Sequence, residues 1–284
     1  MLQIVTDSAS LLTKESGQDL GVHVIPLQIM ADGKTYKDNE EISLEKMTAL
    51  CKSGVKVSSS QPALADKIDL YNTLLEDPQA QILDITMADG LSGTYQSAVM
   101  AKNQSDDPER ILVFNSKCLG GPLQALVKKA AALRDQDKTA QEIVESLEQD
   151  AKTDISTVSV EDFHFLERSG RVSKGLAITG GLLKLIPTVI KTEDGTTLTN
   201  LGISRSFSKA ADQVIHAFQK RGADESYSFF VLDGGNENAA KKAARQIQTA
   251  WPQASVEIIP LCPMFLVHGG PGCIAMQAIR ISQD

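Results

Sequence analysis

Apolar runs alternate with segments of helical period along the first half of the chain. Short apolar runs at Leu2–Val5, Ile82–Thr86 and Ile111–Phe114 have the length and composition of buried strands. The stretches 64–75 and 122–133 carry apolar residues at helical spacing. Strands and helices that alternate in this way predict a mostly parallel sheet covered by helices, which is the α/β class.

The second half of the chain has a different pattern. The apolar runs Pro187–Lys191 and Leu198–Ser204 flank the turn sequence Glu193-Asp-Gly195, which is typical of a β-hairpin. Further strands and helices follow, so hairpin and crossover connections together predict a mixed sheet. We therefore predict two α/β domains, residues 1–154 and residues 155–284, without a flexible linker between them.

The most apolar window of the chain, Leu176–Ile190, predicts a helix over Leu176–Lys184. The window is shorter than the roughly 20 apolar residues that a membrane-spanning helix needs, and it contains Lys184. We therefore expect no stable insertion into a membrane.

Charge and cysteine content narrow the class of protein. A net charge of −8 over 284 residues disfavours nucleic acid as a partner, because phosphate contacts need a basic face. It equally disfavours an anionic membrane surface. The four cysteines have no Cys-x-x-Cys spacing and are typical of reduced thiols. The first residues do not resemble a secretion signal, so we expect a cytoplasmic protein.

Four polar turns follow predicted strands: Thr6–Ser10, Ser58–Gln61, Ala88–Thr94 and Asn115–Gly121. Ligands of open α/β sheets bind beyond the carboxyl ends of the strands, where these turns should meet. In the third turn, Ser92 is expected to be the N-cap of the following helix. A carboxylate or phosphate would be stabilised there by free backbone N–H groups. The turns supply hydroxyl and N–H donors rather than an acid–base pair.

The sequence contains neither a dinucleotide-binding glycine motif nor a cluster with metal-ligand spacing, so we expect no metal or cofactor. His268 lies in the sequence His-Gly-Gly-Pro-Gly, which we expect to be a loop that can approach a ligand closely. Ser92, Asp233 and His268 follow the chain order of an α/β-hydrolase triad, so a serine hydrolase is an alternative. The sequence around Ser92 lacks the last glycine of the nucleophile elbow.

Five motifs occur in an order that resembles the DegV family of bacterial fatty-acid-binding proteins. They are Thr6-Asp7-Ser8, Ser59-Ser60-Gln61-Pro62, Gly90-Leu-Ser-Gly-Thr-Tyr-Gln-Ser-Ala98, Ser169-Gly-Arg-Val-Ser173 and His268-Gly-Gly-Pro-Gly272. The resemblance implies a DegV-like two-domain α/β fold with a long acyl chain buried between the domains. It also implies a non-catalytic carrier, the acyl-binding subunit of a fatty acid kinase that feeds phospholipid synthesis. A lipid-sensing regulatory binding protein is a further alternative.

The resemblance also implies roles for individual residues. Ser59 and Ser92 match hydroxyl positions that bind the carboxylate, and His268 and Arg171 match residues near the head group. The expected carboxylate site comprises Ser59, Ser60, Ser92, Gly93, Thr94, Arg171 and His268. Asp89 stands where family members often have a small hydroxyl residue.

Two further groups of residues complete the prediction. Apolar residues expected to line the acyl-chain pocket are Leu91, Ile178, Leu182, Leu183, Ile186 and Ile190. Arg205 is the expected contact with the kinase, because a partner must orient on an otherwise acidic protein.

Overall fold

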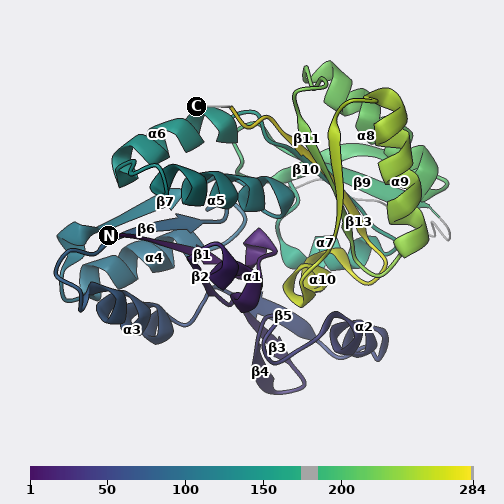
Figure 1. Cartoon of the computed structure of the whole chain (residues 1–284). Coiled ribbons are helices and arrows are strands. Elements are labelled where there is room, and N and C mark those ends of the chain that lie inside the picture. Colours follow the sequence, from purple (N-terminus) through teal and green to yellow (C-terminus); the bar gives the residue numbers. More distant parts are fainter. Residues whose placement is uncertain (174–184, 283–284) are drawn as a thin grey trace.

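A computed structural model describes residues 1–173 and 185–282. The first half of the chain forms a parallel sheet in the order β2-β1-β6-β7. Helices cover both faces (Figure 1). The strands are β1 (Leu2–Asp7), β2 (Val22–Ile25), β6 (Gln81–Thr86) and β7 (Ile111–Asn115), and the helices are α1 (Lys14–Asp19), α3 (Leu64–Leu75), α4 (Thr94–Gln104), α5 (Gly121–Arg134) and α6 (Ala140–Ala151), with short 3₁₀ helices η1 (Ser8–Ser10) and η2 (Pro108–Arg110). The predicted parallel α/β arrangement is confirmed.

Successive residues of each strand in this sheet are buried on opposite faces. Ile4 and Leu83 pack toward α5, whereas Val5 and Ile82 pack toward α3 and α4. Both faces are therefore apolar, which explains why these strands appear in the sequence as continuous apolar runs.

A small antiparallel sheet with the order β4-β3-β5 is an element that the sequence pattern did not predict. Its strands are β3 (Gln28–Ala31), β4 (Lys34–Lys37) and β5 (Val57–Ser60), and α2 (Leu44–Lys52) lies in the connection. The strand-like stretch Val22–Met30 is divided between two sheets, because the chain leaves β2 before Pro26, which has no N–H for a ladder. The serines expected in a turn belong instead to β5, where Ser59 pairs with Ile29.

The second half forms a mixed sheet in the order β10-β9-β8-β13-β11-β12. The predicted hairpin is confirmed, because β9 and β10 are antiparallel and Gly195 occupies the left-handed region with a φ of 75°. The strands are β8 (Ile155–Ser159), β9 (Ile186–Lys191), β10 (Leu198–Ser204), β11 (Ser228–Asp233), β12 (Ser255–Pro260) and β13 (Ile274–Ile279), and the helices are α7 (Phe163–Ser169), α8 (Phe207–Lys220), α9 (Glu237–Ala250) and α10 (Pro263–Gly269).

Helix α5 lies between the two large sheets (Figure 1) and contacts β1 on one side and β11 and β13 on the other. Helices α8 and α9 cover the opposite face of the mixed sheet. The predicted helix over Leu176–Lys184 falls outside the described residues. Within the part of the chain that the structure describes, no helix is long and apolar enough to cross a membrane.

A buried ion pair lies under the parallel sheet. Lys67 of α3 places its Nζ 2.5 Å from Oδ2 of Asp84 on β6, and both side chains are fully buried. The hydroxyl of Tyr71 donates a hydrogen bond to the same carboxylate oxygen. Removal of either charge would leave its partner unpaired in a low-dielectric interior.

We predict that Lys67→Met destabilises the fold by about 3–5 kcal/mol, because the Asp84 carboxylate loses its counter-charge. Lys37 provides a matched control, since its pair with Asp66 is 2.8 Å long and about 40% exposed on each side. Lys37→Met should cost about 0–1 kcal/mol. Urea unfolding of the two variants measures both values, and equal losses would contradict the buried-pair argument.

Candidate functional site

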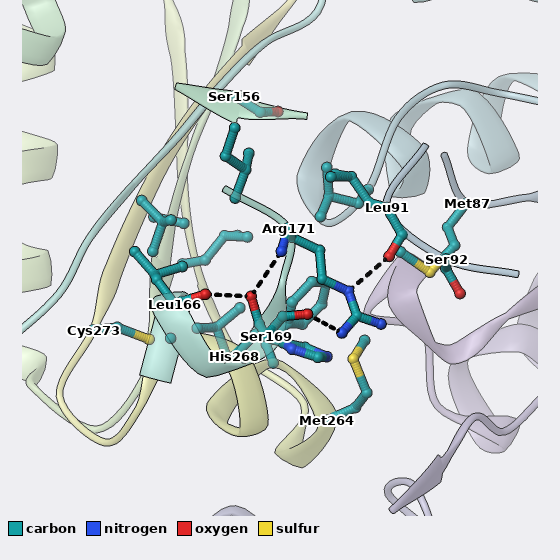
Figure 2. A pocket seen from close by; sticks show the side chains of 18 of the residues that line it. Met87, Leu91, Ser92, Ser156, Leu166, Ser169, Arg171, Met264, His268 and Cys273 are labelled. Atoms are coloured by element: carbon teal, nitrogen blue, oxygen red, sulfur yellow. Dashed lines mark hydrogen bonds between the residues drawn. The ribbon is translucent and has the colours of Figure 1, made fainter. Parts of the chain in front are cut away.

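A largely apolar pocket lies between the two sheets, at the carboxyl end of β6. Its walls come from the loop after β6, from β5, from β8 and β13, and from α7 and α10. Figure 2 shows Leu91 and Ser92 on one side and Leu166 and Cys273 on the other. The two halves of the chain both contribute, so the pocket exists only when they are packed together.

Ser59 and His268 form the polar pair of this pocket. Oγ of Ser59 lies 2.8 Å from Nε2 of His268, although the residues are 209 positions apart in sequence. Burial, and to a smaller extent the nearby positive charge of Arg171, lower the pKa of His268 to about 3. The ring is therefore neutral at physiological pH. When Nε2–H donates to Ser59, the Ser59 hydroxyl is free to donate its own proton into the pocket.

The other ring nitrogen of His268 is buried, and Nδ1 has no hydrogen-bond partner among the described residues. A buried polar atom without a partner is uncommon and costs free energy. This end of the pocket is thus polar and incompletely satisfied.

Arg171 crosses from the second half of the chain to the first. Its Nε donates to the carbonyl of Leu91 at 3.2 Å, and Nη1 donates to the carbonyl of Ser169 at 2.5 Å. Figure 2 shows the guanidinium between these two segments. Burial lowers the pKa of Arg171 from its ordinary value, but a guanidinium remains charged throughout the physiological range. Arg171 therefore provides a fixed positive charge beside His268.

Ser92 lines the pocket, but it does not cap the helix as we expected. Helix α4 begins at Thr94 with Gly93 as its N-cap, and the carbonyl of Gly93 accepts the N–H of Ser97 at 2.9 Å. The Ser92 hydroxyl instead forms a 2.8 Å hydrogen bond with Oγ1 of Thr94 and accepts the N–H of Thr94 at 3.3 Å. The N-cap prediction was therefore wrong by one residue.

The structure brings four of the seven predicted carboxylate-site residues to the pocket wall: Ser59, Ser92, Arg171 and His268. Ser60 is turned away, because successive strand residues face opposite sides, and its Oγ bonds to Gln28 at 3.3 Å. Gly93 faces the Gln61 side chain, and Thr94 is buried beneath Ser92.

The predicted acyl-chain residues separate into three groups. Leu91 lines the pocket. Ile186 and Ile190 are buried in β9 away from it, and Ile190 packs with Val214 and Phe218 under α8, so placing these two at the pocket was a wrong expectation. A residue of a doubly covered strand is buried whichever face it takes, so sequence alone does not assign the face. Ile178, Leu182 and Leu183 lie outside the described residues.

Helix α10 is the part of the site that sequence reasoning missed. We expected His268 in a loop, whereas it lies in the last turn of a helix that also supplies Met264 and Phe265 to the pocket. Pro263 stands at the first turn of this helix, a position that proline favours. Read as a helix start, Pro263 would have predicted the element.

Two buried carboxylates behind the pocket, Asp7 and Asp38, accept hydrogen bonds from the backbone of segments that line it. The buried Asp7 carboxylate accepts the N–H of Met87 at 2.8 Å, and burial raises the pKa of Asp7 to about 6. Asp38 accepts both the Ser8 hydroxyl at 2.8 Å and the N–H of Met264 at 2.9 Å. The turn Thr6–Ser10 therefore supports the pocket from behind rather than lining it.

Ser92, Asp233 and His268 do not form the hydrogen-bonded triad that the hydrolase alternative requires. Asp233 accepts the N–H groups of Gly235 and Asn236 at 2.9 and 2.6 Å and does not bond to His268. Ser92 is bonded to Thr94 rather than to the imidazole. Among residues 1–173 and 185–282, no group of three or more His, Cys, Asp or Glu side chains is arranged to hold a metal ion.

Two other predicted residues lie away from the pocket. Asp89 is partly buried and is not among the described residues of the wall; its N–H donates to Oδ1 of Asn115 at 3.4 Å. Arg205 is exposed and follows the last residue of β10.

Comparison with known proteins gives matches over nearly the whole chain. The family model described as "Uncharacterised protein, DegV family" matches residues 1–280. DegV domain-containing proteins from Listeria innocua (lin2658) and Halalkalibacterium halodurans (BH3627) are 25% and 27% identical, with 97% of each chain covered.

Solved structures are similar as well. A DegV family protein from Thermus thermophilus, described by its fatty acid binding, has a TM-score of 0.88 at 26% identity and covers 98% of this chain and 99% of its own. A stearic-acid-binding protein from Eubacterium ventriosum has a TM-score of 0.87 at 21% identity over 99% and 98% of the chains, and at that identity it supports the fold alone.

We predict that the His268 ring does not titrate between about pH 5 and pH 8 in the ligand-free protein, because its pKa is near 3. Nitrogen chemical shifts of labelled histidine report the protonation state directly. Arg171→Met should raise the pKa only partway toward the ordinary value, since burial is the larger cause. A midpoint near 6 in the unmodified protein would contradict the burial argument.

Proposed function

Because the chain belongs to the DegV family over residues 1–280, we propose that it binds a long-chain fatty acid in the pocket between its two halves. The observation that carries the proposal is the form of the pocket. It is apolar along most of its length and holds Ser59, Ser92, His268 and Arg171 at one end. The fatty acid binding of the Thermus thermophilus relative, which is 26% identical, supports the same ligand class.

The polar end suits a carboxylate. The Ser59 hydroxyl, which is hydrogen-bonded to neutral His268, donates one hydrogen bond to the carboxylate. The hydroxyl of Ser92, also on the pocket wall, donates a second. Arg171 supplies the counter-charge that a carboxylate needs when it leaves water. In the tautomer that carries its proton on Nε2, His268 donates to Ser59 and leaves the Ser59 hydroxyl free to donate to the carboxylate.

Tail and head group contribute differently to binding. Burial of each methylene contributes about 0.8 kcal/mol, so a long acyl chain contributes about 10 kcal/mol before the costs of association. Hydrogen bonds to a charged group contribute about 1.5–3 kcal/mol each. The tail therefore dominates affinity, and the polar end fixes which way the molecule lies.

We predict that the protein purified from a bacterial host carries one long-chain fatty acid. Native and denaturing mass spectra should differ by the mass of that ligand. Ser92→Ala should keep the fold and weaken binding by about 1–3 kcal/mol, since it removes one hydroxyl donor.

Ser60→Ala is the matched control for this experiment, because the Ser60 side chain is turned away from the pocket. This variant should bind fatty acid as the unmodified protein does. Protein that is empty and does not take up added fatty acid would refute the proposal. Esterase activity that depends on Ser92 would instead favour a hydrolase.

We further propose that the protein is a non-catalytic, cytoplasmic carrier that presents the carboxylate to a fatty acid kinase, so that the acyl phosphate enters phospholipid synthesis. The resemblance of its motifs to those of the family supports this role. Arg205 is exposed at the end of β10 on a protein whose net charge is −8, which makes it a candidate contact for an acidic patch of the kinase.

We predict two separable defects in acyl-phosphate formation with a purified fatty acid kinase. His268→Ala should impair phosphorylation more than fatty acid binding, because the relay to Ser59 orients the carboxylate. Arg205→Ala should bind fatty acid normally and weaken kinase association in a way that depends on salt. Wild-type phosphorylation rates in both variants would overturn these assignments.

A further inference from the structure

The floor of the pocket is formed by two paired strands. Ala275 and Gln277 of β13 line the pocket, and they pair with Val158 and Ser156 of β8. Cys273, two residues before Ala275, contacts Gly269 so closely that a Cβ there would lie 2.7 Å from its Sγ. The floor therefore begins beside the residue that follows His268.

Gln277 lies at the other end of this floor. It lies four positions after Cys273, which corresponds to about 13 Å along a strand. In Figure 2 its partner Ser156 lies on the opposite side of the pocket from His268 and Met264. An acyl chain whose carboxylate is bound at His268 would thus point its methyl end toward Gln277 and Ser156.

These two polar side chains are fully engaged with other groups. Oε1 of Gln277 accepts the N–H of Gly121 at 2.9 Å, and Nε2 donates to the Leu119 carbonyl at 3.2 Å and to Oγ of Ser156 at 3.0 Å. Ser156 in turn donates to Oδ1 of Asp154 at 2.6 Å. We call Gln277 and Ser156 the polar wall, and both are buried.

The network continues behind the polar wall. Oδ2 of Asp154 lies 2.5 Å from Nζ of Lys191, and this ammonium donates to the Lys117 carbonyl at 2.5 Å. Asp154, Lys191 and Lys117 line a second, more polar cavity on the far side. The polar wall therefore separates the acyl pocket from this cavity, and it is held in place from behind by a buried ion pair.

We propose that the polar wall sets the longest acyl chain that the pocket accepts. The inference rests on the proposed fatty acid binding. Each methylene that enters apolar space raises affinity about fourfold. A methylene that had to displace the polar wall would break hydrogen bonds of buried groups, which costs more than one methylene contributes. Affinity therefore rises with chain length until the methyl end meets Gln277, and then falls.

The test is a competition among saturated fatty acids that differ in length by two carbons, with the bound species identified by mass spectrometry. Gln277→Ala removes most of the side chain, so its preferred length should increase by at least one step. Gln277→Met keeps the length of the side chain and should keep the preferred length. Ser92→Ala, at the head group, should lower affinity for all lengths by the same factor.

A second variant tests the same inference without touching the hydrogen bonds. Ala275→Val adds carbon atoms to the floor before the polar wall, and it should shift the preference to shorter chains. Unchanged preferences in folded Gln277→Ala and Ala275→Val would refute the role of the polar wall. Failure of the unmodified protein to bind any fatty acid would refute the proposed function itself, so the two failures are distinguishable.

Discussion

The whole arrangement depends on a close approach of backbone to sheet at Gly120 and Gly121. A Cβ on Gly121 would lie 2.2 Å from the Phe230 ring, and one on Gly120 would lie 2.5 Å from Oε1 of Gln277. Gly120 also has a φ of 66°, in the left-handed region. Only glycine fits at both positions. This close packing lets α5 begin against the mixed sheet and brings the two halves together around one pocket.

Sequence patterns predicted those elements whose signals are local. The hairpin turn at Gly195 is set by neighbouring residues, and the structure has it where expected. The small sheet was missed because its strands are short and are spread over residues 28–60, a stretch that also contains helix α2. Antiparallel pairing of this kind is decided by tertiary context rather than by propensity.

The sequence indicated several residues of the site, but not which of their side chains contact one another. Motif resemblance identified Ser59, Arg171 and His268, yet nothing in the sequence pairs Ser59 with a histidine 209 positions later. No sequence pattern predicted the polar wall, in which Gln277 is a single polar residue within an otherwise apolar strand. Such a residue is equally typical of an exposed strand face, and only the opposing backbone of Leu119 and Gly121 reveals why it is buried.

The position of β13 affects how the protein folds during its synthesis on the ribosome. This strand follows the other five described strands of its sheet in sequence, yet it lies between β8 and β11. During synthesis the parallel sheet emerges first, whereas β8 and β11 cannot be joined until residues 274–279 have been made. Until then the face of α5 that β11 and β13 will cover is open to other nascent chains. Long-range pairing of this kind is slow, so the pocket is completed only after β13 has been made and has inserted between β8 and β11.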